Sequence, residues 1–321
     1  MIRGRMRACV RSGVLLLLTA LGVVGPMGAT LARAQAIDDG VLLADGQLVV
    51  GSVYSHDSWK EYWEGTLKRE NGNIGTLITQ TNAWFANYGL TDRLTILGTV
   101  PHVWTTASQG VLHSMHGFQD LNVAAKYRLF DLATRVGAVR AIAVAAGALP
   151  LTDYTPDFFP LSLGSGSKRL SGRGTVSLQP GSGWSVTGST SYTWRSGVTL
   201  DRPFYFTDGQ MFFTDQVDLA NVFDYIVSVG VAKRRIQTTF AFVQQRTLGG
   251  GDIRRQDMPF VSNRMNFTRV GGMVGLPVPT LETLAVQFQY AYTIAGRNVG
   301  QSTTVTAGLA YRLPFGKGSV Q

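Results

Sequence analysis

The chain consists largely of long segments in which apolar and polar side chains alternate residue by residue. One such segment shows the pattern clearly: Val286, Phe288 and Tyr290 take one parity, and Gln287 and Gln289 take the other. Consecutive side chains of a β-strand point to opposite faces, so a segment of this kind predicts a strand with one apolar and one polar face. Few segments beyond the N-terminal region show the period of an amphipathic helix.

Twelve such segments can be identified from alternation and turn residues. They lie near residues 48–58, 74–90, 93–104, 117–130, 137–150, 170–180, 184–195, 217–232, 236–247, 262–276, 283–295 and 301–313. Strands of soluble proteins are usually about 5 to 6 residues long, whereas these span 11 to 17. A tilted strand that crosses the apolar layer of a membrane needs roughly 9 to 11 residues. The lengths therefore favour membrane-spanning strands.

The connections between these segments alternate between long and short. The long ones follow the first, third, fifth, seventh and ninth segments, at 59–73, 105–116, 151–169, 196–216 and 248–261. Only the last connection on that side, near 295–300, is brief. One end of the sheet is thus elaborated and the other compact, which is typical of outer-membrane barrels.

A sheet in lipid has to close on itself, because every backbone polar group in the apolar layer needs a partner within the protein. We therefore predict an all-β fold, a closed antiparallel up-and-down transmembrane β-barrel of about 12 strands. Barrels of about eight strands are filled by side chains and barrels of about sixteen hold a wide channel, so a narrow lumen is expected. Aromatic side chains near the strand ends fit the two membrane interfaces: Trp104, Trp194, Trp184 and Tyr311.

The first 36 residues have the pattern of a secretory signal peptide. Four arginines precede the apolar run at 13–25, and small residues follow at 32–36. We predict that residues 1–36 are removed and that residues 37–321 form the outer-membrane barrel domain. Only about a dozen residues then precede the first strand, too few for a separate plug domain. The expected location is the outer membrane of a Gram-negative-type bacterium.

Removal of this segment changes the charge balance. The net charge falls from +9 to +4, since residues 1–36 hold five arginines and no acidic residue. The basic character of the whole chain is then poor evidence for nucleic-acid binding. The only cysteine, Cys9, lies in the same segment, so no disulfide is expected in the exported chain.

Two stretches carry a resemblance to a known family: "YGLTDRLTILGTVPHVWT" at 88–105 and "GFQDLNVAAKYRLF" at 117–130. They resemble the outer-membrane transporter-like family named for the meta-pathway of phenol degradation. The stretches at 43–59 and 303–313 fit the same pattern, so the resemblance covers most of the exported chain. The family's Gly-Asp motif is replaced here by Gly117-Phe118-Gln119-Asp120, and the chain continues past Phe315. The resemblance implies an outer-membrane barrel that takes up hydrophobic or aromatic compounds.

If the apolar parity faces lipid, the polar parity faces the lumen. In 118–130 this places Leu121, Val123, Ala125, Tyr127 and Leu129 against lipid. The lumen-lining candidates are Arg93, Asp120, Asn122, Lys126, Arg128, Arg173, Arg195, Asp224 and Arg312. Charges in these positions can form a cross-strand ion network that fills the interior, or can select the solutes that pass. The sequence leaves both interpretations open.

The third and fourth long connections are rich in large apolar side chains, which is unusual for loops in water. The candidates for a capture site or a gate are Tyr154, Phe158, Phe159, Phe204, Tyr205, Phe206, Phe212 and Phe213. The same residues could instead pack into a structural lid.

The exported chain has four histidines, all towards the long-loop end: His56, His102, His113 and His116. His113 and His116 have the spacing of a possible metal-ligand pair, but a loop fixes no geometry for it. His102 or His113 with a nearby serine could in principle form a hydrolase site, as in most serine-rich barrels. We predict no catalytic residue, no metal site and no cofactor.

The leading functional prediction is a channel for passive uptake of small hydrophobic or aromatic compounds, and not an enzyme. The alternatives are a barrel with an adhesive or structural role, and, less favoured, a lipid-modifying enzyme of the outer membrane. The expected partners are outer-membrane lipid and lipopolysaccharide, the barrel-assembly machinery and a small-molecule solute, with no nucleic acid.

Overall fold

A computed structural model describes residues 36–233, 235–254 and 259–314. The described chain is all-β and forms a closed antiparallel barrel of twelve strands, as predicted. The barrel strands are β1 (Gln47–Trp59), β4 (Leu77–Thr91), β5 (Leu94–Ala107), β7 (Asp120–Thr134), β8 (Gly137–Pro150), β9 (Arg169–Gly181), β10 (Trp184–Arg195), β15 (Val222–Lys233), β16 (Ile236–Thr247), β17 (Asn266–Val278), β18 (Leu281–Arg297) and β19 (Thr303–Pro314). The predicted signal peptide, except Ala36, lies outside the described residues.

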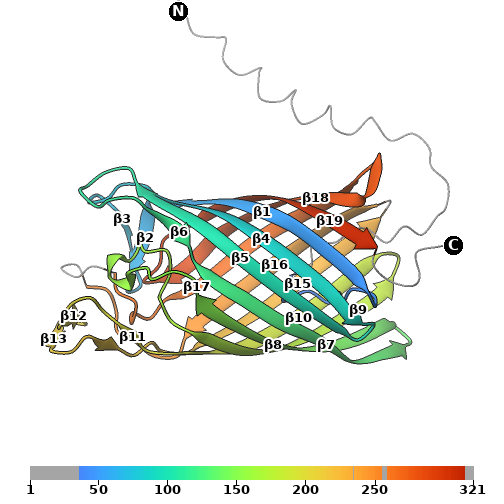
Figure 1. The fold of residues 1–321 in the computed structure, drawn as a ribbon, viewed down its shortest axis with the longest axis horizontal. Helices are drawn as coiled ribbons and strands as arrows, with labels where there is room; N and C mark the ends of the chain where they lie inside the picture. Colours follow the sequence, from blue (N-terminus) through green and yellow to red (C-terminus); the bar gives the residue numbers. More distant parts are fainter. Residues whose placement is uncertain (1–35, 234, 255–258, 315–321) are drawn as a thin grey trace, which may run out of the picture. The chain divides into compact units, whose positions relative to one another are not determined.

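Each strand pairs with its neighbours in sequence, and the barrel closes because β1 pairs with both β4 and β19. Figure 1 shows the strands running obliquely across the wall. No helix in the described part of the chain is long and apolar enough to cross a bilayer.

The elements outside the wall are short. They are β2 (Glu61–Glu64), β3 (Leu67–Glu70), β6 (Met115–Phe118), the 3-10 helix η1 (Pro156–Phe158), β11 (Val198–Thr199), β12 (Tyr205–Thr207), β13 (Gln210–Phe212) and β14 (Gln216–Val217). All lie in the predicted long connections except that β6 and β14 extend into the strands predicted at 117–130 and 217–232, and in Figure 1 β2, β3, β12 and β13 lie beyond one end of the barrel. We call this the outer end and the end with tight turns the inner end.

The predicted strands agree with the observed ones except near the outer end. The prediction of one strand over 117–130 is split in the structure, where β6 pairs with β5 and β7 begins at Asp120. The strand predicted at 217–232 begins only at Val222, because Gln216–Val217 pairs with Val198–Thr199 to form a small loop sheet. Alternation continues through these loop residues, so the pattern overestimated the length of the wall strand.

Strand β7 shows how the two faces of the wall differ. Val123 and Tyr127 are 46% and 45% exposed on the outside, whereas Lys126 is fully buried inside. A register shift between Arg128 and Phe130 then moves Phe130 to the outside next to Leu129. Such a bulge places two residues opposite one and changes the parity that follows. The predicted orientation of this strand therefore agrees with the structure up to the bulge.

Candidate functional site: the barrel lumen

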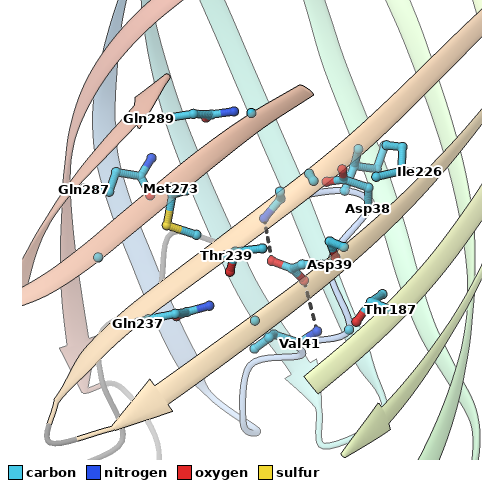
Figure 2. Close-up of a pocket in the computed structure, with 18 of the residues that line it drawn as sticks. Asp38, Asp39, Val41, Thr187, Ile226, Gln237, Thr239, Met273, Gln287 and Gln289 are labelled. Atoms are coloured by element: carbon cyan, nitrogen blue, oxygen red, sulfur yellow. Dashed lines mark hydrogen bonds between the residues drawn. The ribbon is translucent and has the colours of Figure 1, made fainter. Parts of the chain in front are cut away.

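The lumen contains a cavity of about 1090 Å³. One side of its wall, on β1, β4, β5, β7 and β8, is mostly apolar, and it includes Val53, Ala83, Phe85, Leu97, Ala124 and Ala146. The other side, from β9 round to β18, is mixed: hydroxyl and amide groups, including Ser177, Thr187, Ser228, Thr239, Gln287 and Gln289, lie among glycines and apolar side chains such as Ile226, Phe267 and Met273. Figure 2 shows Gln237, Gln287 and Gln289 on this side, with Met273 among them. The cavity therefore offers a solute a mostly apolar side and a side that also carries hydrogen-bonding groups.

Residues 36–43, which precede β1, lie inside the lumen. The Lys126 ammonium group donates hydrogen bonds to the carbonyl oxygens of Ala36 (2.8 Å) and Asp39 (3.0 Å) and forms an ion pair with Asp39 Oδ1 (2.5 Å). Lys126 is fully buried, so this set of oxygens is what compensates the cost of removing its charge from water. Below, residues 36–43 are called the lumen segment.

The lumen segment also packs against the apolar side of the wall. Ile37 and Leu42 contact the buried cluster that includes Leu97 and Ile142. On the opposite side Gly40 approaches β9 so closely that a Cβ at this position would lie 2.8 Å from the Cβ of Ser177. A larger residue at position 40 would have to move the segment away from β9. In Figure 2 Asp38, Asp39 and Val41 project into the cavity.

Asp38 in the lumen segment has an unusual environment. Burial raises the pKa of its carboxyl above the ordinary value of 3.8, and the negative charge of Asp39 adds to the increase. Arg173 and Lys126 act in the opposite direction but do not outweigh burial. The segment therefore carries a carboxyl group for which the lumen favours the protonated form.

The structure places most lumen-lining candidates in ion pairs. Asp120 is buried, accepts a hydrogen bond from the Tyr154 hydroxyl (2.6 Å) and pairs with Arg169 (2.8 Å). Arg173 pairs with Asp224 (2.7 Å). The contacts fit the ion-network interpretation for these residues, and a role in selecting solutes stays a prediction.

The remaining candidates lie apart from one another. Arg93 is exposed in the inner turn between β4 and β5, because that turn projects beyond the wall. Arg128 donates to Asp131 at the inner end, and Arg195 donates to the carbonyl oxygen of Ala220 (2.6 Å) at the outer end. Asn122 lines the cavity. Arg312 is half-buried opposite Val49 near the inner end.

The third long connection, residues 151–168, folds into the outer mouth. The Thr105 hydroxyl donates to the carbonyl oxygen of Leu161 (2.5 Å), and Leu161 packs with Leu77. Tyr154 and Leu163 pack against Val103 on the lumen side of β5. The hydrogen bond to Asp120 and burial raise the pKa of Tyr154, with burial the larger cause. We call residues 151–168 the mouth loop.

The eight aromatic candidates of the outer loops fall into two groups. Tyr154 and Tyr205 are buried, and Phe159 packs with Tyr205 in a loop cluster formed by Val198, Leu200, Val217, Leu219, Phe260 and Val261. Phe158, Phe204, Phe206, Phe212 and Phe213 are exposed. None of the eight, all of them described, lines the cavity. The first group packs within the outer loops, as the lid interpretation expects. A capture role for the five exposed phenylalanines remains a prediction.

The four histidines do not come together as metal ligands. No group of three or more His, Cys, Asp or Glu side chains with metal-binding geometry occurs among the described residues. His102 and His116 lie with ring centroids 6.1 Å apart, and His102 also contacts Trp104 and Phe118. His113 is exposed in the loop before β6.

The lumen segment is the part of the site that sequence reasoning missed. The prediction assigns no position to the residues between the signal peptide and the first strand, but residues 36–43 occupy lumen space. One feature of the sequence indicates this segment. Lys126 lies on the lumen parity of a strand whose neighbouring residues are mostly small or apolar, and a buried ammonium group needs a partner. Asp38 and Asp39, near the start of the exported chain, could have supplied it.

The fold can be compared with known structures. The barrel is similar to an outer-membrane channel from Pseudomonas putida F1, with a TM-score of 0.67 and 14% sequence identity over 86% of this chain and 98% of that one. The two proteins therefore share the same barrel fold. No family model matches the chain, and no curated protein matches its sequence.

Two further structures are more distant. They are the translocator domain of the autotransporter NalP from Neisseria meningitidis (TM-score 0.46, 11% identity, 84% of this chain and 90% of that one) and the monoaromatic hydrocarbon channel CymD (TM-score 0.41, 9% identity, 85% and 89%). At these scores they say nothing about what this chain does. The fold implied by the family resemblance is thus confirmed, while membership of the phenol-degradation family stays a prediction. A closed barrel with apolar side chains exposed around its wall belongs in an outer membrane.

Proposed function

We propose that the barrel is a channel for passive uptake of small apolar compounds, aromatic ones among them, across the outer membrane. The observation that carries this proposal is the mostly apolar side of the lumen cavity, from Val53 to Ala146. A lumen that served only ions would gain nothing from a mostly apolar side, because apolar surface exposed to water in a channel is unfavourable.

The charges of the lumen support the same proposal. Lys126, Arg173 and Asp120 each have a partner of opposite charge, so their fields are largely cancelled within the wall. A solute in the cavity then meets apolar groups and neutral donors and acceptors, together with the guanidinium groups of Arg169, which is paired with Asp120, and of Arg269, which donates to the Thr293 hydroxyl. Weak binding of this kind lets a solute enter and also leave, which conduction requires.

The cavity lies beside the lumen segment, which is consistent with a narrow path for solutes through the barrel. The segment occupies the side next to β7, and the cavity extends past it to Gly181, Gly183 and Trp184 at the inner end. We propose that a small solute passes between the segment and the glutamine side chains opposite, and that displacement of the segment would widen this path. The outer-membrane channel of similar fold supports a channel role without specifying the solute.

The proposal is tested by uptake of naphthalene, a small aromatic hydrocarbon, into whole cells that express the protein. Cells with the wild-type chain should take up naphthalene severalfold faster than cells without it. Ala146→Trp places a bulky side chain in the cavity and should return uptake to background. Ala145→Trp, one residue away on the lipid-facing side, is the matched control and should keep wild-type uptake. Uptake that is independent of the protein, or equal in the two variants, would contradict a lumen path.

A further inference from the structure

Arg269 on β17 places a guanidinium group in the wall of the lumen cavity, in the outer half of its strand. Its Nε donates a hydrogen bond to the Thr293 hydroxyl on β18 (3.0 Å), and its guanidinium carbon lies 4.6 Å from the centre of the Phe267 ring. Its two terminal nitrogens donate to no described residue, and they are not enclosed by the protein. Both contacts are with neutral groups, so the positive charge is held in place without being neutralised.

The other ionisable groups of the cavity wall are compensated. Among the described residues, the ionisable side chains of that wall are Asp38, Asp39, Arg169 and Arg269. Asp39 pairs with Lys126, and Arg169 pairs with Asp120. Burial favours the protonated, neutral form of Asp38. Of these four described groups, Arg269 is therefore the one that presents an unpaired charge to the cavity.

Asp57 on β1 is a carboxylate that acts on Arg269 over a longer distance. No ion pair joins the two side chains, both of which are described, and Asp57 instead accepts hydrogen bonds from the hydroxyls of Ser302 and Thr304. Its charge lowers the cost of holding Arg269 in the wall but occupies none of the guanidinium N–H groups. These N–H groups therefore remain available to an anion in the lumen.

The cavity wall beside Arg269 consists of small residues. The rung on its inner side is formed by three register partners on β16, β17 and β18 that all line the cavity: Ala241, Gly271 and Ala291. Larger side chains return one rung further in, where Figure 2 shows Thr239, Met273 and Gln289. The guanidinium group therefore borders an apolar area in which short side chains leave room for a ring.

The ligand chemistry that fits these contacts combines an anionic group with an apolar body. The planar guanidinium fork binds a carboxylate through two parallel hydrogen bonds, and such charge-assisted bonds are stronger than neutral ones. An inorganic anion would leave the area of Ala241, Gly271 and Ala291 exposed to water, whereas an aromatic ring would cover it. An ionisable side chain within a membrane-spanning wall commonly marks the path of a solute.

We propose that Arg269 forms a carboxylate-binding subsite of the lumen and that the preferred solutes are small aromatic carboxylates of the benzoate type. The carboxylate accepts hydrogen bonds from the terminal nitrogens of Arg269, and the ring lies over Ala241, Gly271 and Ala291. This inference rests on the proposed channel function and narrows its solute class. If Arg269 only braced the wall through its contacts with Thr293 and Phe267, its replacement would change stability but not the discrimination between charged and neutral solutes.

The test is block of the single-channel current by benzoate at neutral pH, with the folded full-length exported chain in planar bilayers. Benzoate should interrupt the current, whereas benzyl alcohol, a neutral molecule of similar shape, and sulfate, an inorganic anion, should not do so at the same concentration. Arg269→Met should weaken the block by benzoate about tenfold, as expected for loss of charge-assisted hydrogen bonds. Arg269→Lys keeps the charge but not the fork, so its block should be intermediate.

The matched control is Arg246→Met, the same change at an exposed position of the neighbouring strand β16, and it should behave like the wild type. A thermal melt of each variant checks that the barrel is folded. Equal block by benzoate and benzyl alcohol, or equal block of the wild type and Arg269→Met by benzoate, would overturn the subsite. Block by sulfate as strong as that by benzoate would overturn the solute class, since the site would then take any anion.

Uptake of naphthalene by the same variants separates this inference from the channel proposal. A neutral hydrocarbon needs no cation, so Arg269→Met should keep wild-type naphthalene uptake. A channel that conducts and takes up naphthalene without discriminating benzoate would lose only the subsite. Absence of both current and naphthalene uptake would remove the channel function, and the subsite with it.

Discussion

The two ends of the lumen are narrowed in different ways. At the outer end the mouth loop is anchored by buried apolar contacts of Leu161 and Leu163 and by the hydrogen bond between Tyr154 and Asp120. Towards the inner end the lumen segment is held by the Lys126 ammonium group, by hydrogen bonds from Arg140 to Gly40 and from Leu43 to Thr95, and by the apolar contacts of Ile37, Leu42 and Leu43. Unlike the wall, the lumen segment belongs to no strand. It is the part that we expect to yield.

The lumen segment and the fifth outer connection differ in their expected response to pH. In the lumen segment the pKa of Asp38 is raised, so docking is favoured below the ordinary carboxyl pKa of 3.8 and weakens as the pH rises through the raised value. In the fifth outer connection, hydrogen bonds from Arg297 and Asn298 lower the pKa of Asp252 to about 2. The stability that ionised Asp252 gives to this connection is fully present above pH 3.8 and is lost as the pH falls towards 2. Acid therefore tightens the lumen segment and loosens the outer loops.

The largest effect should come from removing the lumen segment. Deletion of residues 37–42 together with Lys126→Met, which avoids an unpaired buried charge, should raise single-channel conductance in planar bilayers severalfold. The wall strands are unchanged apart from Lys126, so the barrel should still fold. If conductance stayed at the wild-type level, the segment would not limit the path and the contrast between the two ends would fail.

Lys126→Met alone should have the next largest effect. It removes three hydrogen bonds to the lumen segment, one of them an ion pair. The free energy of unfolding should fall by about 2 to 3 kcal/mol, and channel openings should become more frequent. The same change at the exposed Lys233 is the control. Equal unfolding curves and recordings for the two variants would mean that Lys126 does not hold the segment.

Tyr154→Phe should weaken the mouth loop without opening it. The change removes the hydrogen bond to Asp120, which keeps its ion pair with Arg169. We expect a loss of about 1 to 2 kcal/mol in the free energy of unfolding and unchanged conductance. A conductance increase as large as that of Lys126→Met would show that the mouth loop, and not the lumen segment, is the weaker of the two.

The smallest effect is the pH response of Asp38. Because its pKa is raised in the lumen, conductance should increase as the pH rises above 3.8 through the raised pKa and the carboxyl group ionises. Asp38→Asn should flatten this dependence near the low-pH conductance. A wild-type profile that decreases with pH would contradict the assignment of this group.

The wall of the barrel could be predicted from the sequence, whereas the contents of the lumen could not. Strand orientation follows from local alternation, so Val123 and Lys126 are assigned to opposite faces by their spacing alone. The bulge after Arg128 shows in the sequence only as two consecutive apolar residues, Leu129 and Phe130, and alternation alone does not assign them to the same face. The contact between Asp39 and Lys126 joins residues 87 positions apart, and no periodicity encodes it. The same limit applies to the loop aromatics, whose burial depends on contacts such as that of Tyr205 with Phe260.

The most direct test of the account fixes the lumen segment to the wall. A Cβ at position 40 would lie 2.8 Å from that of Ser177, and disulfides need a separation near 3.8 Å, so Gly40→Cys with Ser177→Cys should form a bridge after a small shift of the segment. The only natural cysteine is Cys9, in the predicted signal peptide. Single-channel conductance is then measured at pH 8 before and after reduction. The account predicts a low conductance that rises on reduction, and equal conductance in both states would contradict it.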